Sequence, residues 1–520
     1  MAAVEGSIAS AEEMDRAGLP ETPDSESPNT GPLNSSEAQA PMSLFSRIWW
    51  PPILALGGAL YGARSLTDNS FLTHLATGRL ILDGRLPRVD PYTFTGGGRP
   101  WIAQSWLASW LYAVLEDIGG AFAIRAMIAA VGALLALGIW RLSAPVKSVG
   151  LRLLVVVCAP AIGGSWWNER PQILAFALVV ACAIVLVERR SSWWLLPMFA
   201  IWMNVHGSFP LGGLFVSIWA GTQLIRTRRV QSLLPVGALG AGIALGTLFS
   251  PYGLELAWFP VKLLSRGEQL KFMAEWQPLR LDSPTAFLFV AEVLVLGYVM
   301  ARERDVLGIC ASAIFVVLAA TAVRNTALAA IVMIPFASNS LSRRAERIGA
   351  LPESTWFGDN HRARQQPGWR ATASASVAVA LLVALFLVRT PGYALDDYPT
   401  RAVSWMQARS LVANPGIKVL STDYTGNYLE WRYGASAQAW IDDRAELHSV
   451  DLASDYVHLL LGKGETEELL ERNPHDLILW PEELPLAKFL ESSAEYQVLT
   501  KVDGYLVACR VGGSVNCAGV

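Results

Sequence analysis

The chain is dominated by long apolar segments that carry almost no charge through their middles, and this feature constrains its fold more than any other. A helix that crosses ~30 Å of hydrocarbon needs about 20 mostly apolar residues. Surface helices of soluble proteins instead keep a polar stripe at the helical period. We therefore expect an α-helical polytopic membrane protein with about 11 transmembrane helices. The candidate segments cover residues 48–66, 120–141, 150–166, 171–188, 192–206, 208–225, 232–249, 285–301, 306–322, 325–341 and 371–389.

The connections between these segments alternate in character, and every second one is rich in arginine. By the positive-inside rule the Arg-rich connections are cytoplasmic. If the N-terminus is also cytoplasmic, an odd number of spans places the C-terminus on the other side. The basic residues of these connections are Arg141, Lys147 and Arg152, then Arg189 and Arg190, then Arg226, Arg228 and Arg229, then Arg302 and Arg304, and finally Arg343, Arg344 and Arg347 onward to Arg370.

The sequence divides into three predicted parts. Residues 1–43 hold eight acidic residues and a single basic one, Arg16, so we expect a disordered acidic cytoplasmic tail. Residues 44–389 form the transmembrane domain, with a first extracytoplasmic loop over 67–119. Residues 390–520 have ordinary soluble composition and predict an extracytoplasmic α/β domain.

The C-terminal part alternates between helical and strand patterns. Helices are expected near 399–412, 426–433, 450–461 and 465–473. Strands are expected over 418–421, 438–441 and 477–480, with a final pair near 496–509. Cys509 and Cys517 could pair if this end of the chain is extracytoplasmic.

The first loop predicts two helices before the second membrane segment. Residues 70–83 carry an apolar stripe and are interpreted as an amphipathic helix lying on the membrane. A second helix is expected over 102–116, with Trp101, Trp106 and Trp110 as interfacial anchors.

Polar residues gather in the loops opposite the Arg-rich side. Such residues are often only solvated helix ends, but ionisable groups near membrane depth are costly and indicate function when they recur on one face. The candidate residues are Asp68, His74 and Asp90 in the first loop, Asn168, Glu169 and Arg170 in the second, Asn204 and His206 in the third, Glu275 in the fourth and Arg324 in the fifth.

This set suits chemistry at a lipid phosphate. Asp68 is the candidate general base, with Asp90 and His74 as further catalytic candidates. Arg170 and Arg324 offer planar donors for a phosphate, and His206 could add a hydrogen bond or a proton. Asp90 could also hold a divalent cation, or simply begin a turn, because Pro91 follows it. Asn168, Glu169, Asn204 and Glu275 complete the candidate site.

The first loop follows the pattern D-x-D-x-x-x-H-L-x-x-G-x-x-I and then L-P-x-x-D-P-x-[ST]-[FY]-T, with Ser70 in place of the second acid. It matches at Asp68, His74, Leu75, Gly78, Ile81, Leu86, Pro87, Asp90, Pro91, Thr93, Phe94 and Thr95. Further matches are Arg170–Gln172, Trp202–Phe209, Glu275–Leu279, Arg324–Asn325, Thr425–Trp431 and Ile441–His448. With these motifs the chain resembles bacterial GT-C-class integral-membrane glycosyltransferases, a group that includes protein mannosyltransferase-like and lipid-A sugar transferase-like proteins.

The resemblance implies a GT-C-like fold in a bacterial plasma (inner) membrane and an enzyme of the hexosyl or pentosyl transferase kind. It also implies a polyprenyl-phosphate-linked sugar as donor, an unidentified acceptor hydroxyl outside the cytoplasm, and a first-loop acid, Asp68, as base. A divalent cation is the one cofactor left open. A net charge of −3 gives no basic field for nucleic acid.

Two other functions stay open at this point. A transporter or flippase of a lipid-linked precursor would show broken helices near the midplane, for which Pro160 and Pro197 are the nearest candidates. A non-enzymatic envelope assembly protein would use the soluble domain to bind a partner. The cluster Asp442–Asp443–Arg444 is interpreted as a strand end whose carboxylates pair with Arg444 and cap the next helix, rather than as a second site.

Overall fold

The computed structural model describes residues 41–146, 149–347 and 369–519. The predicted acidic tail therefore lies outside the described residues, apart from its last three positions, which belong to the first helix. Residues 348–368 of the last Arg-rich connection lie outside them as well.

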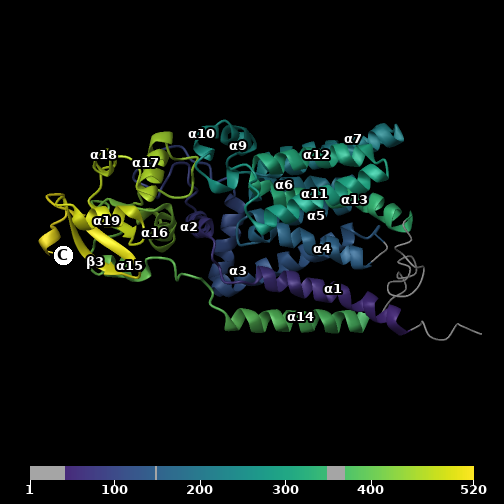
Figure 1. Ribbon diagram of the computed structural model, residues 1–520, viewed down its shortest axis with the longest axis horizontal. Coiled ribbons are helices and arrows are strands. Elements are labelled where there is room, and N and C mark those ends of the chain that lie inside the picture. The colour runs from purple at the N-terminus through teal and green to yellow at the C-terminus, as the bar shows by residue number, and fades with distance from the viewer. Residues whose placement is uncertain (1–40, 147–148, 348–368, 520) are drawn as a thin grey trace, which may run out of the picture. The chain divides into compact units, whose positions relative to one another are not determined.

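Each of the eleven predicted segments contains a helix, and these helices form the long bundle seen in Figure 1. Within the described residues, three helices are long and apolar enough to cross a membrane by length and composition, namely those ending at Leu142, Phe249 and Arg302. The helices are thus confirmed, while the number of crossings stays a prediction. Their bounds are α1 (Pro41–Gly62), α3 (Trp106–Leu142), α4 (Val149–Gly163), α5 (Gln172–Val187), α6 (Leu195–Val205), α7 (Phe209–Thr227), α8 (Leu234–Phe249), α11 (Pro284–Arg302), α12 (Val306–Thr321), α13 (Thr326–Arg347) and α14 (Trp369–Arg389).

One buried arginine within the bundle ties three helices together. Arg125 of α3 is 1% exposed and donates hydrogen bonds to the carbonyl oxygens of Ala63, Arg64, Leu387 and Thr390. These carbonyl groups lie at the C-terminal ends of α1 and α14 or just beyond them. The last carbonyl groups of a helix have no hydrogen-bond donor within the helix. The guanidinium therefore satisfies the ends of both helices at one point.

Glycine lets α1 and α3 approach closely. A Cβ atom built on Gly58 would lie 2.3 Å from the carbonyl oxygen of Gly132, a distance that real contacts do not allow. Small residues at such contacts let helix backbones pack against one another, which is a common basis of helix association in membranes.

The amphipathic helix of the first loop is present, but its predicted place on the membrane surface is wrong. α2 (Asn69–Leu82) packs against α3 on one side and α16 (Asp423–Tyr433) on the other, and Phe71, Leu72 and Leu75 are buried. Its apolar stripe is therefore covered by protein. The second predicted helix is the outer part of α3, which begins at Trp106 and breaks at Gly119 and Gly120, where the backbone is not helical.

The C-terminal part is the predicted α/β domain, with a four-stranded sheet in the order β1-β2-β4-β3. β1 and β2 are parallel and the other pairs are antiparallel. The expected strand over 438–441 is wrong, because only Ala439 forms isolated bridges, one of them to Thr93 of the first loop. The elements are α15 (Thr400–Gln407), β1 (Val419–Ser421), α16, α17 (Val450–Leu461), α18 (Thr466–Arg472), β2 (Leu477–Pro481), α19 (Pro485–Ser492), β3 (Tyr496–Val502) and β4 (Tyr505–Arg510).

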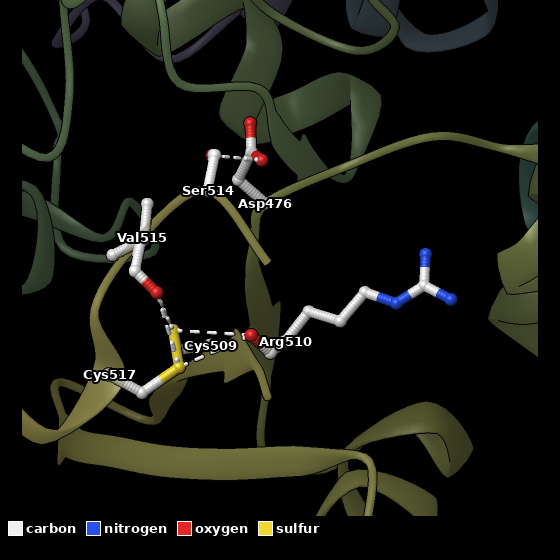
Figure 2. Close-up of a disulfide and its surroundings, with 6 residues drawn as sticks. All are labelled: Asp476, Cys509, Arg510, Ser514, Val515 and Cys517. Atoms are coloured by element: carbon white, nitrogen blue, oxygen red, sulfur yellow. Dashed lines mark hydrogen bonds between the residues drawn. A yellow bond between two sulfur atoms is a disulfide. The ribbon is translucent and has the colours of Figure 1, made fainter. Parts of the chain in front are cut away.

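A disulfide joins Cys509 of β4 to Cys517, as Figure 2 shows. The bridge lies against the backbone around Arg510 and Val515, and the Ser514 hydroxyl beside it donates to Asp476. Disulfides persist in oxidising compartments, so this pair agrees with the predicted extracytoplasmic place of the domain.

We expect the packing of α1 on α3 to be sensitive to one added methyl group. Gly58→Ala should lower the free energy of unfolding by about 1–3 kcal/mol, because the new Cβ would press on the Gly132 carbonyl. The adjacent Gly57→Ala is the matched control, since a Cβ there meets nothing within 4 Å. Thermal unfolding in detergent measures both, and equal midpoints for the two variants would contradict the packing.

The oxidation state of the C-terminal cysteines can be counted directly. The chain has five cysteines, of which Cys158, Cys182 and Cys310 are free. Alkylation of the denatured, non-reduced protein with a maleimide polymer should therefore add three labels, and reduction should raise this to five. Full labelling of protein taken from cells without reductant would place the domain in a reducing compartment.

Candidate active site

A cavity of about 840 Å³ lies where the first loop, the other loops on the same face and the C-terminal domain meet. Several of the predicted site residues line it, together with residues of the C-terminal domain. These side chains are His74, Arg170, His206, Glu275, Arg324 and Asp443. Five of the ten candidate residues from the sequence thus share one cavity, namely His74, Arg170, His206, Glu275 and Arg324.

Four charged side chains form a chain of ion pairs at the wall of this cavity. Arg170 donates from Nε to Asp68 Oδ2 at 2.7 Å and from Nη1 to Glu275 Oε2 at 2.6 Å. The other Glu275 oxygen accepts from Arg324 Nη1 at 2.6 Å. The order Asp68, Arg170, Glu275, Arg324 alternates in sign, and the two arginines come from loops that are far apart in sequence.

Asp68 sits at the N-terminus of α2 and is held from several sides. Its Oδ1 accepts from the Phe71 backbone N–H, as an N-cap does, and its Oδ2 also accepts from Asn168 Nδ2 at 2.9 Å. The Glu169 carboxylate accepts from the backbone N–H groups of Thr67 and Asp68. Asn168 and Glu169 therefore fix both the side chain and the backbone of Asp68.

The charges of this network are set by burial and by their partners. Burial raises the pKa of Glu169, and backbone hydrogen bonds oppose that shift. For Glu275, burial would raise the pKa, but the neighbouring Arg324 and Arg170 outweigh it and lower the pKa below its usual value. Burial would lower the pKa of Arg170, yet Asp68 and Glu275 raise it. Glu275 and Arg170 therefore stay charged at neutral pH.

The two cavity histidines are neutral at physiological pH. Burial, followed by the charge of Arg170, lowers the pKa of His74 to about 3. Burial, followed by the charge of Arg324, lowers the pKa of His206 to about 3. His74 Nδ1 lies 3.1 Å from the Ser109 hydroxyl and His206 Nδ1 lies 2.8 Å from that of Ser208. His206 is thus a neutral hydrogen-bonding group, and the alternative of a ready proton donor is not supported.

Asp90 does not line the cavity. It is 4% exposed, accepts from the Tyr92 N–H and the Thr93 hydroxyl, and pairs with Arg444 Nη2 at 2.7 Å. The turn that the Asp90–Pro91 dipeptide allowed is therefore what the structure contains. The guanidinium of Arg444 therefore supplies the positive charge beside Asp90. Among the described residues, no group of three His, Cys, Asp or Glu side chains is arranged as a metal site.

Asn204 also lies apart from the cavity, in the packing between helices. Its Oδ1 accepts from Trp106 Nε1 at 2.8 Å, and its Nδ2 donates to the carbonyl oxygen of Gly246 at 3.1 Å. It therefore joins α6 to α3 and α8, and both the oxygen and the nitrogen of this buried amide form hydrogen bonds to neighbouring helices.

The cluster near residue 442 divides into two parts. Asp442 pairs with Arg444, as the sequence interpretation held, and also lies 3.2 Å from His448 Nε2. Both Asp442 and Asp443 line the cavity, and Asp443 accepts from the Ser70 hydroxyl of the first loop. Sequence reasoning missed Asp443 as a site residue, although it stands in the motif Ile441–His448 that carried part of the resemblance.

No protein-family model matches the chain, and no curated protein matches it. Among solved structures, the chain is similar to the oligosaccharyltransferase of Archaeoglobus fulgidus, which was solved tethered to an acceptor peptide containing the NVT sequon. The TM-score is 0.49 and the identity 12%, over 85% of this chain and 70% of that one. A likeness at this level carries no functional argument, so the proposal below stands on the site.

The depressed pKa of His206 predicts acid sensitivity. Above pH 6.5 the histidine is neutral in both folded and unfolded chains, so it has no effect. Below pH 6.5 only the unfolded chain gains the proton, and stability should fall by up to about 1.4 kcal/mol per pH unit down to about pH 3.

His206→Gln should remove this contribution, so its loss of stability between pH 6.5 and 3 should be smaller than that of the wild type. The measurement is the unfolding midpoint at a series of pH values. An unaltered acid dependence in His206→Gln would contradict the assignment.

Proposed function

We propose that this chain is an integral-membrane enzyme of the GT-C glycosyltransferase type. It transfers a sugar from a polyprenyl-phosphate donor to a hydroxyl acceptor on the extracytoplasmic side of a bacterial plasma membrane. The observation that carries the proposal is the pair of guanidinium groups, Arg170 and Arg324, held side by side on Glu275 at the wall of a large cavity.

Two guanidiniums arranged in this way suit a phosphate. Arginine binds carboxylate and phosphate oxygens through the same parallel N–H donors, and such charge-assisted bonds are stronger than neutral ones. The Arg170 bonds to Asp68 and Glu275 use Nε and Nη1, and the Arg324 bond to Glu275 uses Nη1. Each arginine therefore has further N–H groups to offer to a phosphate entering the cavity.

A lipid carrier agrees with the surroundings of the cavity. α9 (Leu254–Leu264) and α10 (Gly267–Leu270) border it, and Leu263, Leu270 and Phe272 form part of its lining. α9 also exposes Trp258 at 60%, beside an apolar face typical of a helix at a membrane interface. A polyprenyl chain could therefore reach the cavity from the lipid.

The donor phosphate would leave with the electron pair of the sugar C1–O bond. Arg170 and Arg324 would stabilise the charge that develops there, which is how fixed cations accelerate group transfer. The prediction that Asp68 is the base stays a prediction. Its carboxylate accepts from Arg170, Asn168 and the α2 backbone, so orienting Arg170 is the role that its contacts support.

Undecaprenyl phosphate is the simplest probe of the proposed phosphate site. Arg324→Gln should raise its Kd roughly 10- to 100-fold in detergent micelles, because one charge-assisted contact is lost. Isothermal titration measures the change. Arg401→Gln is the matched control, because its side chain is 79% exposed in the C-terminal domain. Equal affinity of Arg324→Gln and the wild type would remove the basis of the proposal.

Activity is tested separately with radiolabelled undecaprenyl-phosphate mannose, glucose and arabinose in membranes that contain the protein. Label should move from lipid to a lipid-free or more polar product, and Arg170→Gln should lower this transfer at least as much as it weakens lipid binding. If the wild type transfers no label from any of the three donors, the proposed transferase activity is contradicted.

A further inference from the structure

The acidic side chains around the cavity differ in whether a cation neutralises them. Glu275 pairs with Arg170 and Arg324, and Asp442 pairs with Arg444. Asp68, just beside the cavity, pairs with Arg170. A carboxylate that already accepts from a guanidinium is a weak proton acceptor, because the positive charge stabilises its ionised form.

Three further carboxylates line the cavity, those of Asp423, Glu446 and Asp443, and none of them forms an ion pair among the described residues. Asp423 accepts from the Tyr456 hydroxyl of its own domain, whereas Asp443 is hydrogen-bonded to the first loop. Asp443 is half-buried, and the hydroxyl of Ser70 donates a hydrogen bond to its Oδ2. Its backbone N–H donates to Asn427 Oδ1 at 3.2 Å, which fixes the main chain beneath it. Ser70 lies on α2, only two residues from Asp68, so the hydroxyl joins this carboxylate from the C-terminal domain to the first loop.

Resting on the function proposed above, we propose that Asp443 is the general base that removes the proton from the acceptor hydroxyl, with Asp68 as a positioning residue for Arg170. The active site is then shared between the membrane domain and the C-terminal domain. The phosphate-binding arginines would come from the membrane domain and the base from the C-terminal domain.

The step balances within the groups already named. The acceptor oxygen forms a bond to C1 of the sugar while its proton passes to the Asp443 carboxylate. The bond between C1 and the phosphate oxygen breaks, and its electron pair leaves with the polyprenyl phosphate, held by Arg170 and Arg324. Asp443 afterwards returns the proton to the departing phosphate or to water.

The electrostatic environment of Asp443 agrees with this role. Its pKa is raised to about 6, mainly by burial and also by the neighbouring Asp442, although the Ser70 hydroxyl, Arg170 and Asn427 oppose the shift. Tyr398 is the other titratable group whose charge couples to it. A base is most effective when its pKa lies near the working pH. The rate should therefore rise with pH and reach half its plateau near pH 6.

The first test compares binding with transfer in the full-length protein. Asp443→Asn should lower the transfer rate roughly 100- to 10,000-fold, the usual contribution of general base catalysis. It should bind undecaprenyl phosphate with wild-type affinity, because the phosphate contacts are intact. Asp451→Asn removes an exposed carboxylate from the same domain and is the matched control. Transfer by Asp443→Asn within twofold of the wild type would overturn the assignment.

The second test keeps the carboxylate and changes its partner. Ser70→Ala removes the hydroxyl that lowers the pKa of Asp443, so the acid limb of the transfer–pH profile should move to higher pH while the plateau is largely kept. An acid limb that stays in place would overturn the proposal. A wild type that transfers nothing would instead refute the proposed function, so the two failures are distinct.

Discussion

The arrangement of charge along Asp68, Arg170, Glu275 and Arg324 is the constraint on which the rest of the site depends. A single charge buried at this depth would cost several kcal/mol, and only a partner of opposite sign with good geometry offsets that cost. Arg170 lies between the carboxylates of Asp68 and Glu275, and Arg324 lies against Glu275. Each of the four charges therefore has a partner of opposite sign. The network also joins four loops that are far apart in the sequence, so this part of the cavity wall forms only when the helices beneath them are assembled.

A second group of charges fixes the C-terminal domain to the helical bundle. Arg444 pairs with Asp442 of its own segment and with Asp90 of the first loop, and Glu430 of α16 accepts from Thr73 of α2 at 2.7 Å. Main-chain hydrogen bonds between the first loop and Ala439 continue the contact. The two domains therefore share a rigid seam, and this seam holds the Asp443 side chain in the cavity beside Ser70.

Local sequence properties were enough to predict most of the helices and strands. Helices were expected in all eleven apolar segments and are present there, and the strands β1, β2, β3 and β4 lie where the alternation of apolar residues placed them. The errors concern contacts with distant parts of the chain. The apolar stripe of α2 resembles that of a helix at a membrane interface. Only the tertiary structure shows that α16 packs against this helix. The segment around Ala439 has strand-like residues but pairs at isolated positions only.

The sequence by itself predicted the helical segments, the loops in which polar groups gather and the four residues of the ion-pair network, because hydrophobicity and charge are local properties. Tertiary structure decided the roles. Asp90 and Asn204 are as polar as Asp68, yet burial against Arg444 and between helices gives them structural tasks. Asp443 follows Asp442 directly, yet Asp442 pairs with Arg444 and Asp443 accepts from Ser70. The Ser70 contact joins residues hundreds of positions apart, which no local pattern records.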